Sequence, residues 1–453
     1  MTRLWSPETP LRMVLCAGLL LLALSPASSQ VNSTTTDTGG GSGDDMQLRV
    51  PPPVNGQAYS TEFAGESEQN YWRAGFTLNS AWSSNITGGA HPVGDMSYSF
   101  WPTIALNKIT YRSQLLLNYS PGFTIYQRSS GYNQADQNVN VSFQYRISPT
   151  VTLGLQEGFH KTSNIFNQPD PTSASPVSGS LPPPGVTVIA PLADLINTAT
   201  AAQLTWQVGA DSMLGASGTF NYLYYPNPDQ AAGVYNSRAA GGSIFYSRRL
   251  NERYYLGATY QYQNISSDQA NSPNTRTQTQ TVFAFLSIYL KPTLSLSISG
   301  GPQHYASTQL PFPPASSWSP MFMVSMGWQG NRTALAASYS RMVGSGGGLN
   351  GAYHANMAAV SANWKVSREW TAGVGASYSG NTTLTPLFLS SAGGRTISGT
   401  VSAQRTLGEH ASVQFGYSWT NQNYRQIAAI ASTPNVNRVF VSVNYQFSRP
   451  LQK

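Results

Sequence analysis

The fold is decided by the stretch NVNVSFQYRI, residues 138–147. Apolar side chains at the odd positions alternate there with polar side chains at the even positions. Because successive side chains of a β-strand point to opposite faces, a strand with this pattern has one apolar and one polar face. The same alternation recurs at residues 71–82, 294–300 and 439–447, and it continues from Tyr71 to the end of the chain. The sequence therefore predicts an all-β protein.

The length of these segments separates a membrane barrel from a soluble sandwich. They run for about 10–13 residues, whereas strands of soluble proteins usually have about five or six. A tilted strand needs about 9–11 residues to cross a bilayer. Aromatic residues also mark the segment ends. The starting aromatics are Trp72, Tyr111, Tyr254 and Trp370, and the ending aromatics are Trp82, Tyr119, Tyr262, Tyr339, Tyr378 and Tyr417. Two such rows match the two membrane interfaces.

Short connections alternate with long ones along the chain, as they do in outer-membrane barrels. Counting segments predicts a transmembrane antiparallel β-barrel of about 18 strands, with both termini on the short-turn, periplasmic side. The count depends on residues 119–127, which we interpret as part of one strand that passes through Pro121. If Pro121 and Gly122 form a turn instead, the count changes, and sixteen strands is the alternative.

The composition agrees with a wall that has two different faces. Only 9% of the 453 residues are charged, against about 25% in an average soluble domain. This scarcity excludes a soluble helical enzyme, and the chain lacks the several apolar runs of about 20 residues that a helical membrane protein needs. Aromatic residues make up 11%, which excludes an ordinary disordered chain. The net charge of +7 is spread thinly, so we expect no nucleic-acid partner.

The first 70 residues differ from the rest. A basic start, an apolar run over residues 13–24 and small residues near position 29 predict a secretory signal at residues 1–29. The alternative is an uncleaved anchor helix. Residues 30–70 are rich in Gly, Ser and Pro, and we interpret them as a flexible N-terminal extension before a barrel at 71–453. A plug or partner-docking segment is the alternative. The one cysteine, Cys16, lies inside the signal, so the mature chain would have no disulfide.

The last predicted strand ends in an aromatic pair, Tyr445 and Phe447. In this respect, and in its overall pattern, the chain resembles the bacterial outer-membrane porin family. It departs from that family because six residues follow Phe447 and because Ser442 stands where glycine is common. The resemblance implies a bacterial outer-membrane location, contact with outer-membrane lipid, insertion by the barrel-assembly machinery and a pore for small polar solutes. It leaves a homo-oligomer open. No motif identifies a solute.

The predicted pore has a wide aqueous lumen, because 16–18 strands are too many for side chains to fill. The function we expect is passive diffusion of small hydrophilic solutes. The alternative is a structural or partner-docking barrel of an envelope polysaccharide or export system. The longest loop, residues 160–199, resembles the porin loop that folds inward and constricts the pore. The alternative is a loop that stays outside.

Charged residues suggest a field across this pore. Arg73, Arg112 and Arg146 have the parity of the polar faces and are predicted to line the lumen, whereas Asp170 and Asp194 lie in the long loop. A basic wall opposite an acidic constriction would orient polar solutes. The alternative is that the arginines sit at strand ends and pair locally. The five histidines form no local motif with Asp or Ser, so we expect no enzyme, no metal site and no cofactor.

Overall fold

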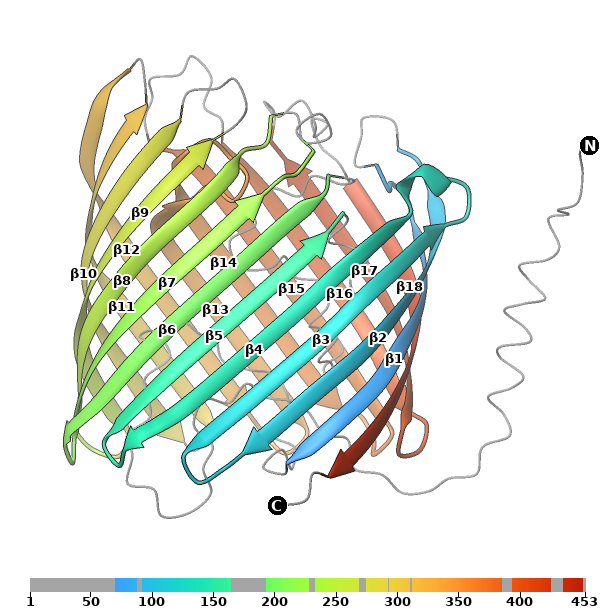
Figure 1. The fold of residues 1–453 in the computed structure, drawn as a ribbon, viewed down its shortest axis with the longest axis horizontal. Coiled ribbons are helices and arrows are strands. Elements are labelled where there is room, and N and C mark those ends of the chain that lie inside the picture. The colour runs from blue at the N-terminus through green and yellow to red at the C-terminus, as the bar shows by residue number, and fades with distance from the viewer. Residues whose placement is uncertain are drawn as a thin grey trace, which may run out of the picture.

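The protein is a closed β-barrel, shown here by a computed structural model (Figure 1). The structure describes residues 70–87, 92–163, 193–227, 233–268, 274–291, 293–309, 312–384, 393–424 and 435–450. The strands are β1 (Tyr71–Ser83), β2 (Asp95–Ile109), β3 (Ser113–Tyr126), β4 (Gln134–Ser148), β5 (Val151–Thr162), β6 (Leu195–Gly209), β7 (Ser212–Tyr224), β8 (Asn236–Arg249), β9 (Tyr254–Asp268), β10 (Thr275–Lys291), β11 (Leu294–Gln309), β12 (Phe312–Gln329), β13 (Thr333–Ser345), β14 (Ala352–Lys365), β15 (Trp370–Thr383), β16 (Gly394–Thr406), β17 (Ala411–Asn423) and β18 (Asn435–Pro450).

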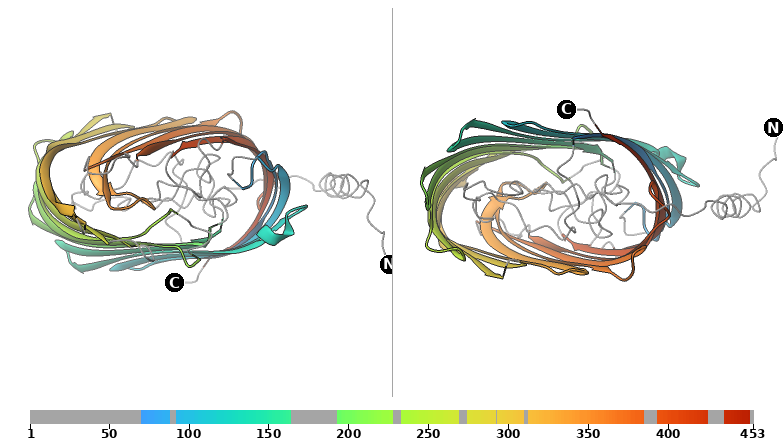
Figure 2. Two further views of the ribbon diagram at one scale, coloured as in Figure 1. Left: turned by 90° about the horizontal axis from the view of Figure 1, so that it is seen from above. Right: turned by 90° about the horizontal axis from the view of Figure 1, so that it is seen from below.

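The sheet closes because β1 pairs with both β2 and β18. Every strand is antiparallel to its neighbours in sequence, and the ring contains 18 strands, so the predicted fold class and strand number are confirmed. The ring is oval rather than circular in cross-section (Figure 2). β1 starts and β18 ends at the same end of the barrel. That this end faces the periplasm stays a prediction.

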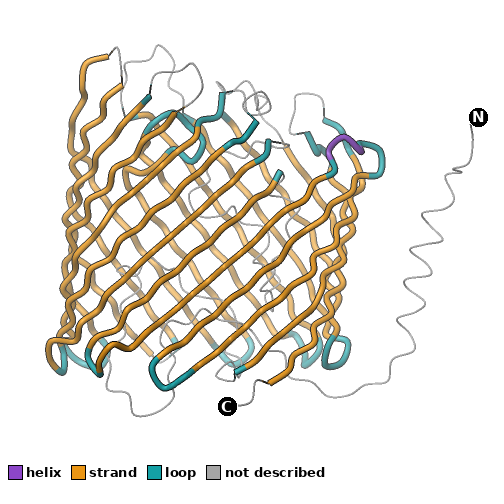
Figure 3. Tube along the Cα trace, in the orientation of Figure 1, coloured by secondary structure: helices purple, strands orange, loops and turns teal. Residues whose placement is uncertain are grey.

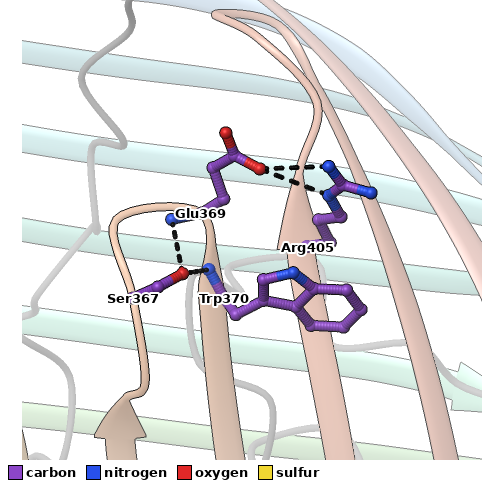
Figure 4. Close-up of polar contacts among 4 residues, drawn as sticks. All are labelled: Ser367, Glu369, Trp370 and Arg405. Atoms are coloured by element: carbon purple, nitrogen blue, oxygen red, sulfur yellow. Dashed lines mark hydrogen bonds and ion pairs between the residues drawn. The ribbon is translucent and has the colours of Figure 1, made fainter.

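The two ends of the barrel differ in their connections, and we call them the short-turn end and the long-loop end. At the short-turn end, the turn between β14 and β15 shows how a few residues reverse the chain (Figure 4). The Ser367 hydroxyl accepts hydrogen bonds from the backbone N–H groups of Glu369 and Trp370 at 3.3 and 3.1 Å. Arg405 of β16 donates to the Glu369 carboxylate at 3.2 Å and lies over the Trp370 ring.

Helix is scarce in the described part of the chain. A single 3₁₀ turn, η2 (Ser130–Tyr132), connects β3 to β4 at the long-loop end (Figure 3). Among the described residues there is no helix whose length and apolar character would let it span a membrane.

The outer face is apolar and bounded by aromatic rows. Exposed aromatics near the short-turn end are Trp72, Trp206, Tyr254, Trp328, Trp364 and Trp370, and those nearer the long-loop end are Trp82, Tyr98, Tyr339, Tyr378 and Tyr417. Between the rows lie exposed aliphatic residues such as Leu78, Val374 and Val401. The rows match two membrane interfaces. Tyr111, predicted to start a strand, instead lies in the turn before β3.

The strand through Pro121 forms as predicted, since β3 is continuous from Ser113 to Tyr126. The register with β2 is the same on both sides of an interruption, where Pro102 and Pro121 lie opposite one another. Proline lacks the N–H donor of a sheet ladder, so placing the two prolines together confines the missing hydrogen bonds to one position. Next to them, the Trp101 ring is fully buried and covers Gly122, where an added Cβ would lie 2.4 Å from a ring carbon.

This contact predicts the effect of a side chain at residue 122. Gly122→Val forces the Trp101 ring out of its site, and overpacking of this kind destabilises by about 1–3 kcal/mol. The measurement is urea unfolding of the barrel in detergent, followed by Trp fluorescence. The double variant Gly122→Val with Trp101→Ala should recover part of the loss because the clash is gone. A double variant whose destabilisation equals the sum of the two single effects would contradict this packing.

The predicted loop at 160–199 is shorter than expected. β5 extends to Thr162 and β6 begins at Leu195, because Leu195 and Asn197 already alternate as inner-face residues of a strand. Residues 164–192, with Asp170, lie outside the described residues, as do the predicted signal at 1–29 and nearly all of the extension at 30–70.

Candidate lumen constriction

The inner wall is built from hydroxyl and amide side chains that hydrogen-bond across neighbouring strands. Ser287 of β10 bonds Ser297 of β11 at 2.9 Å. Ser377 of β15 bonds Ser398 of β16 at 2.6 Å. At the seam, the Ser442 hydroxyl of β18 donates to the Asn79 amide oxygen of β1 at 3.0 Å. These links hold a polar surface in place without charge.

The three predicted arginines lie near the short-turn end. Arg73 is on the inner face of β1, is 8% exposed and has its guanidinium 4.6 Å from the Tyr71 ring centroid. Arg112 is exposed in the turn before β3. Its carbonyl accepts a hydrogen bond from the Arg146 backbone N–H at 2.7 Å, so these two residues are neighbours. Parity predicted the inner side for Arg73 and Arg146, and a position at the strand ends was the alternative to a pore-lining role.

Asp194 lies at the opposite, long-loop end, immediately before β6. One carboxylate oxygen accepts a hydrogen bond from the Ser163 hydroxyl at 2.5 Å, and the other accepts one from the Asn227 amide at 2.7 Å. The structure therefore does not bring Asp194 together with the arginines. A role for either group in guiding solutes stays a prediction.

A constriction of a different origin comes from β13 and β14. β12 pairs with β13 only over Phe322–Gln329 against Ala334–Arg341. Beyond Arg341, β13 leaves the wall and continues inward, still paired with β14. Figure 2 shows this orange hairpin inside the oval of the wall. We call residues 342–355 the inner hairpin.

Inner-face side chains of four consecutive wall strands, β8 to β11, hold the inner hairpin by hydrogen bonds. The Gln303 side chain of β11 bonds both the N–H and the carbonyl of Val343, at 2.7 and 3.1 Å. Ser237 of β8 bonds Ser345 at 2.5 Å. Bonds from β9 and β10 complete the set. They are from the Gly351 N–H to the Ser267 hydroxyl at 3.0 Å and from the Thr275 hydroxyl to the Asn350 amide oxygen at 2.8 Å.

Apolar packing adds to these bonds. Val343 and Ala352 have the parity of the lipid-facing Tyr339, so both would face outward if the strands stayed in the wall. Instead they pack on the inner-face residues Ala239, Ile265 and Tyr305. The wall is therefore double at this point, and the outer face of the hairpin is covered.

The other face of the inner hairpin belongs to a cluster that crosses the lumen. Its members are Ala193, Leu195, Leu223, Tyr225, Val234, Leu349, Tyr353 and Tyr424. These residues come from the β6–β8 side of the barrel, from the inner hairpin and from the end of β17. The Tyr424 hydroxyl also accepts a hydrogen bond from the Asn381 amide of β15 at 3.1 Å. β7 and β17 are ten strands apart in one direction around the ring of 18 and eight in the other, which places them on nearly opposite sides. Burial raises the pKa of the Tyr225 phenol, so this group stays neutral.

The turn of the inner hairpin depends on glycine. Gly347, Gly348 and Gly351 have positive φ angles, and a Cβ on Gly351 would lie 2.9 Å from the Thr275 side chain. The run GSGGGLNG at 344–351 is thus the sequence signal for a tight, inserted hairpin. By itself, however, this run does not show where the hairpin goes.

The histidines in the described part of the chain lie beside aromatic or polar side chains, and His354 also has the charged Arg341 nearby. His354 lies 3.2 Å from the Ser319 hydroxyl and against Tyr305, so it belongs to the inner-hairpin packing. His304 lies against Trp318, and His160 bonds Asn138. Among the described residues no three His, Cys, Asp or Glu side chains come together as a metal site.

Closure of the ring, the apolar outer band and the aromatic rows together decide the type of protein. The chain is a β-barrel of the bacterial outer-membrane type. No protein-family model and no curated protein matches it.

Three solved structures illustrate the similarity in fold. OpdK of Pseudomonas aeruginosa with vanillate is 10% identical at a TM-score of 0.40, with 83% of this chain and 99% of that chain covered. OccAB4 of Acinetobacter baumannii is 8% identical at 0.38, with 85% and 100% covered. The ferric citrate transporter FecA is 9% identical at 0.40, with 84% and 79% covered. Similarity at this level does not separate a passive channel from a specialised transporter.

Proposed function

We propose that this barrel is a pore for passive diffusion of small hydrophilic solutes across the outer membrane. The observation that carries the proposal is the polar inner wall, with few charged side chains, of a closed barrel whose strand number exceeds what wall side chains can fill. Hydroxyl and amide groups can replace water around a polar solute without holding a counterion. In this proposal the long-loop end faces outward and the inner hairpin sets the narrowest section.

The experiment is planar-bilayer recording of the purified full-length protein. We expect stepwise conductance with weak ion selectivity, because the wall carries few charges. A variant that lacks residues 30–70 is recorded in parallel and should conduct at least as well. Heat-dependent gel mobility verifies in each case that the protein is a folded barrel. If the full-length protein and the shortened variant are both folded barrels and neither gives conductance steps, the proposal is wrong.

One observation weighs against a freely open lumen and keeps the partner-docking alternative in view. Inner-face residues at the other side of the oval, such as Trp101 and Asp136, are 0% exposed, so strand number alone overstates the free lumen. A partner-docking barrel of an envelope polysaccharide or export system would give no conductance in the experiment above. Insertion by the barrel-assembly machinery remains part of the proposal under either function.

A further inference from the structure

The outer wall carries a carboxyl group where lipid is expected. Glu157 lies on β5 between Leu155 and Phe159, which share its face, and Leu155 is 41% exposed. In the register Glu157 is opposite Val141 of β4 and Thr200 of β6, and both of those residues lie on the outer face. The carboxyl therefore points away from the lumen.

Glu157 also lies deep in the apolar band. It is six residues from Val151, where β5 leaves the short-turn end. At about 3.3 Å per residue and a tilt of about 40°, this separation corresponds to about 15 Å along the barrel axis. The apolar band of such barrels is about 25 Å tall, so Glu157 is near its middle. The outward-facing charges Lys161 and Arg405, by contrast, lie at strand ends.

The carboxyl is incompletely satisfied at this depth. Its Oε2 atom accepts a hydrogen bond from the Thr200 hydroxyl at 2.5 Å, in a contact that is itself exposed to the exterior. Thr198 stands next on the same face of β6. Acyl chains offer no hydrogen-bonding group, and ionisable side chains within membranes are usually covered by protein rather than lipid.

The surface beside Glu157 is shaped for close approach. One pair of register positions nearer the short-turn end, Ala202, Gly218 and Gly242 follow one another across β6, β7 and β8. All three face outward, and their larger neighbours Leu204 and Phe220 are 42% exposed on either side. Small residues at a membrane interface let two backbones come near, and polar side chains then bond across it.

We propose that this face of β5–β8 is where a second copy of the chain packs in the membrane, with Glu157 and Thr200 beside the two-fold axis. A second copy presents the same carboxyl and the same two hydroxyls at the same depth. A two-fold contact brings identical patches together. Because the Thr200 hydroxyl already donates to Glu157 of its own copy, the donor for each carboxyl is the Thr198 hydroxyl of the other copy. A second copy of the chain therefore offers matching hydrogen-bond donors and acceptors at the same depth in the membrane.

Cysteine cross-linking in isolated outer membranes tests the contact. The variant Ala202→Cys is made in the full chain with Cys16→Ser, and the control is Val401→Cys, which is 57% exposed on the outer face of β16. We expect oxidant or a short bismaleimide to give a homodimer band for Ala202→Cys only. Adding Glu157→Leu should lower the yield about tenfold, the effect expected for one intramembrane hydrogen-bonding group, whereas Glu157→Gln should keep it.

Each remaining outcome counts against the proposal. Equal yields for residues 202 and 401 would mean random collision, and a cross-linked band with the mass of another protein would mean a different partner. A yield that Glu157→Leu leaves unchanged would remove Glu157 from the contact. Heat-dependent gel mobility of every variant shows that the barrel is folded, so a loss of cross-linking cannot come from misfolding.

Discussion

Shortening the inner hairpin should raise the single-channel conductance at least about twofold, because conductance follows the open cross-section. The variant replaces residues 343–354 with Asn-Gly, a sequence that favours a two-residue hairpin turn, on the register pair Met342 and Ala355. This removes Leu349 and Tyr353 from the cluster that crosses the lumen. Planar-bilayer recording of the purified variant beside the parent protein measures the effect.

A milder variant and a control make this result specific. Tyr353→Ala with Tyr424→Ala keeps the hairpin and removes two aromatic rings from the crossing cluster, so its conductance should lie between those of the parent and the shortened form. Trp318→Ala changes a side chain that is 68% exposed on the outer face of β12 and should leave conductance unchanged. Parent-like conductance in a folded, shortened barrel would mean that the narrowest section lies elsewhere.

A charge in the middle of the outer face should impair folding into the membrane. Val374 is 50% exposed and lies four residues from each of the girdle aromatics Trp370 and Tyr378. Arg at the midplane of a barrel's lipid face costs about 2–4 kcal/mol, so Val374→Arg should lower the free energy of unfolding in vesicles by that amount.

The matched control is Ser338→Arg, on the inner face of β13. Water in the lumen can solvate this guanidinium, so the loss should stay below about 1 kcal/mol. Urea titration of folding into lipid vesicles measures both variants. If both lose equal stability, the assignment of inner and outer faces on β13–β15 is wrong.

The strands could be predicted because lipid and water impose opposite requirements on alternate side chains. β15 begins at Trp370 as expected. Errors are larger where a strand continues beyond the membrane. β6 begins five residues early, at Leu195, because its first residues pack inside the barrel rather than against lipid.

The inner hairpin could not be predicted from alternation. Val343 and Ala352 are apolar with outward parity, which is how lipid-facing residues look, yet their contacts are on the inside of β8–β11. Parity identifies the face of a strand but not what lies against that face. The same limit applies to Arg112 and Arg146. Their parity predicted the lumen and left a strand-end position open as the alternative, and the structure supplied the backbone contact between them.

β12 and β13 pair over only part of their length. As a result, the girth of this barrel in the membrane and the bore at its mouth are set by different features, although the two are usually linked in barrels. Strand number fixes the girth within the membrane, where the ring is complete. At the mouth, the bore depends instead on how far the inner hairpin overlaps the wall, and a few side chains such as Gln303 and Ser237 set that overlap. Mutations at these positions can widen or narrow the opening while the lipid-facing surface, and with it membrane insertion, stays the same. Permeability can thus evolve in this barrel independently of assembly.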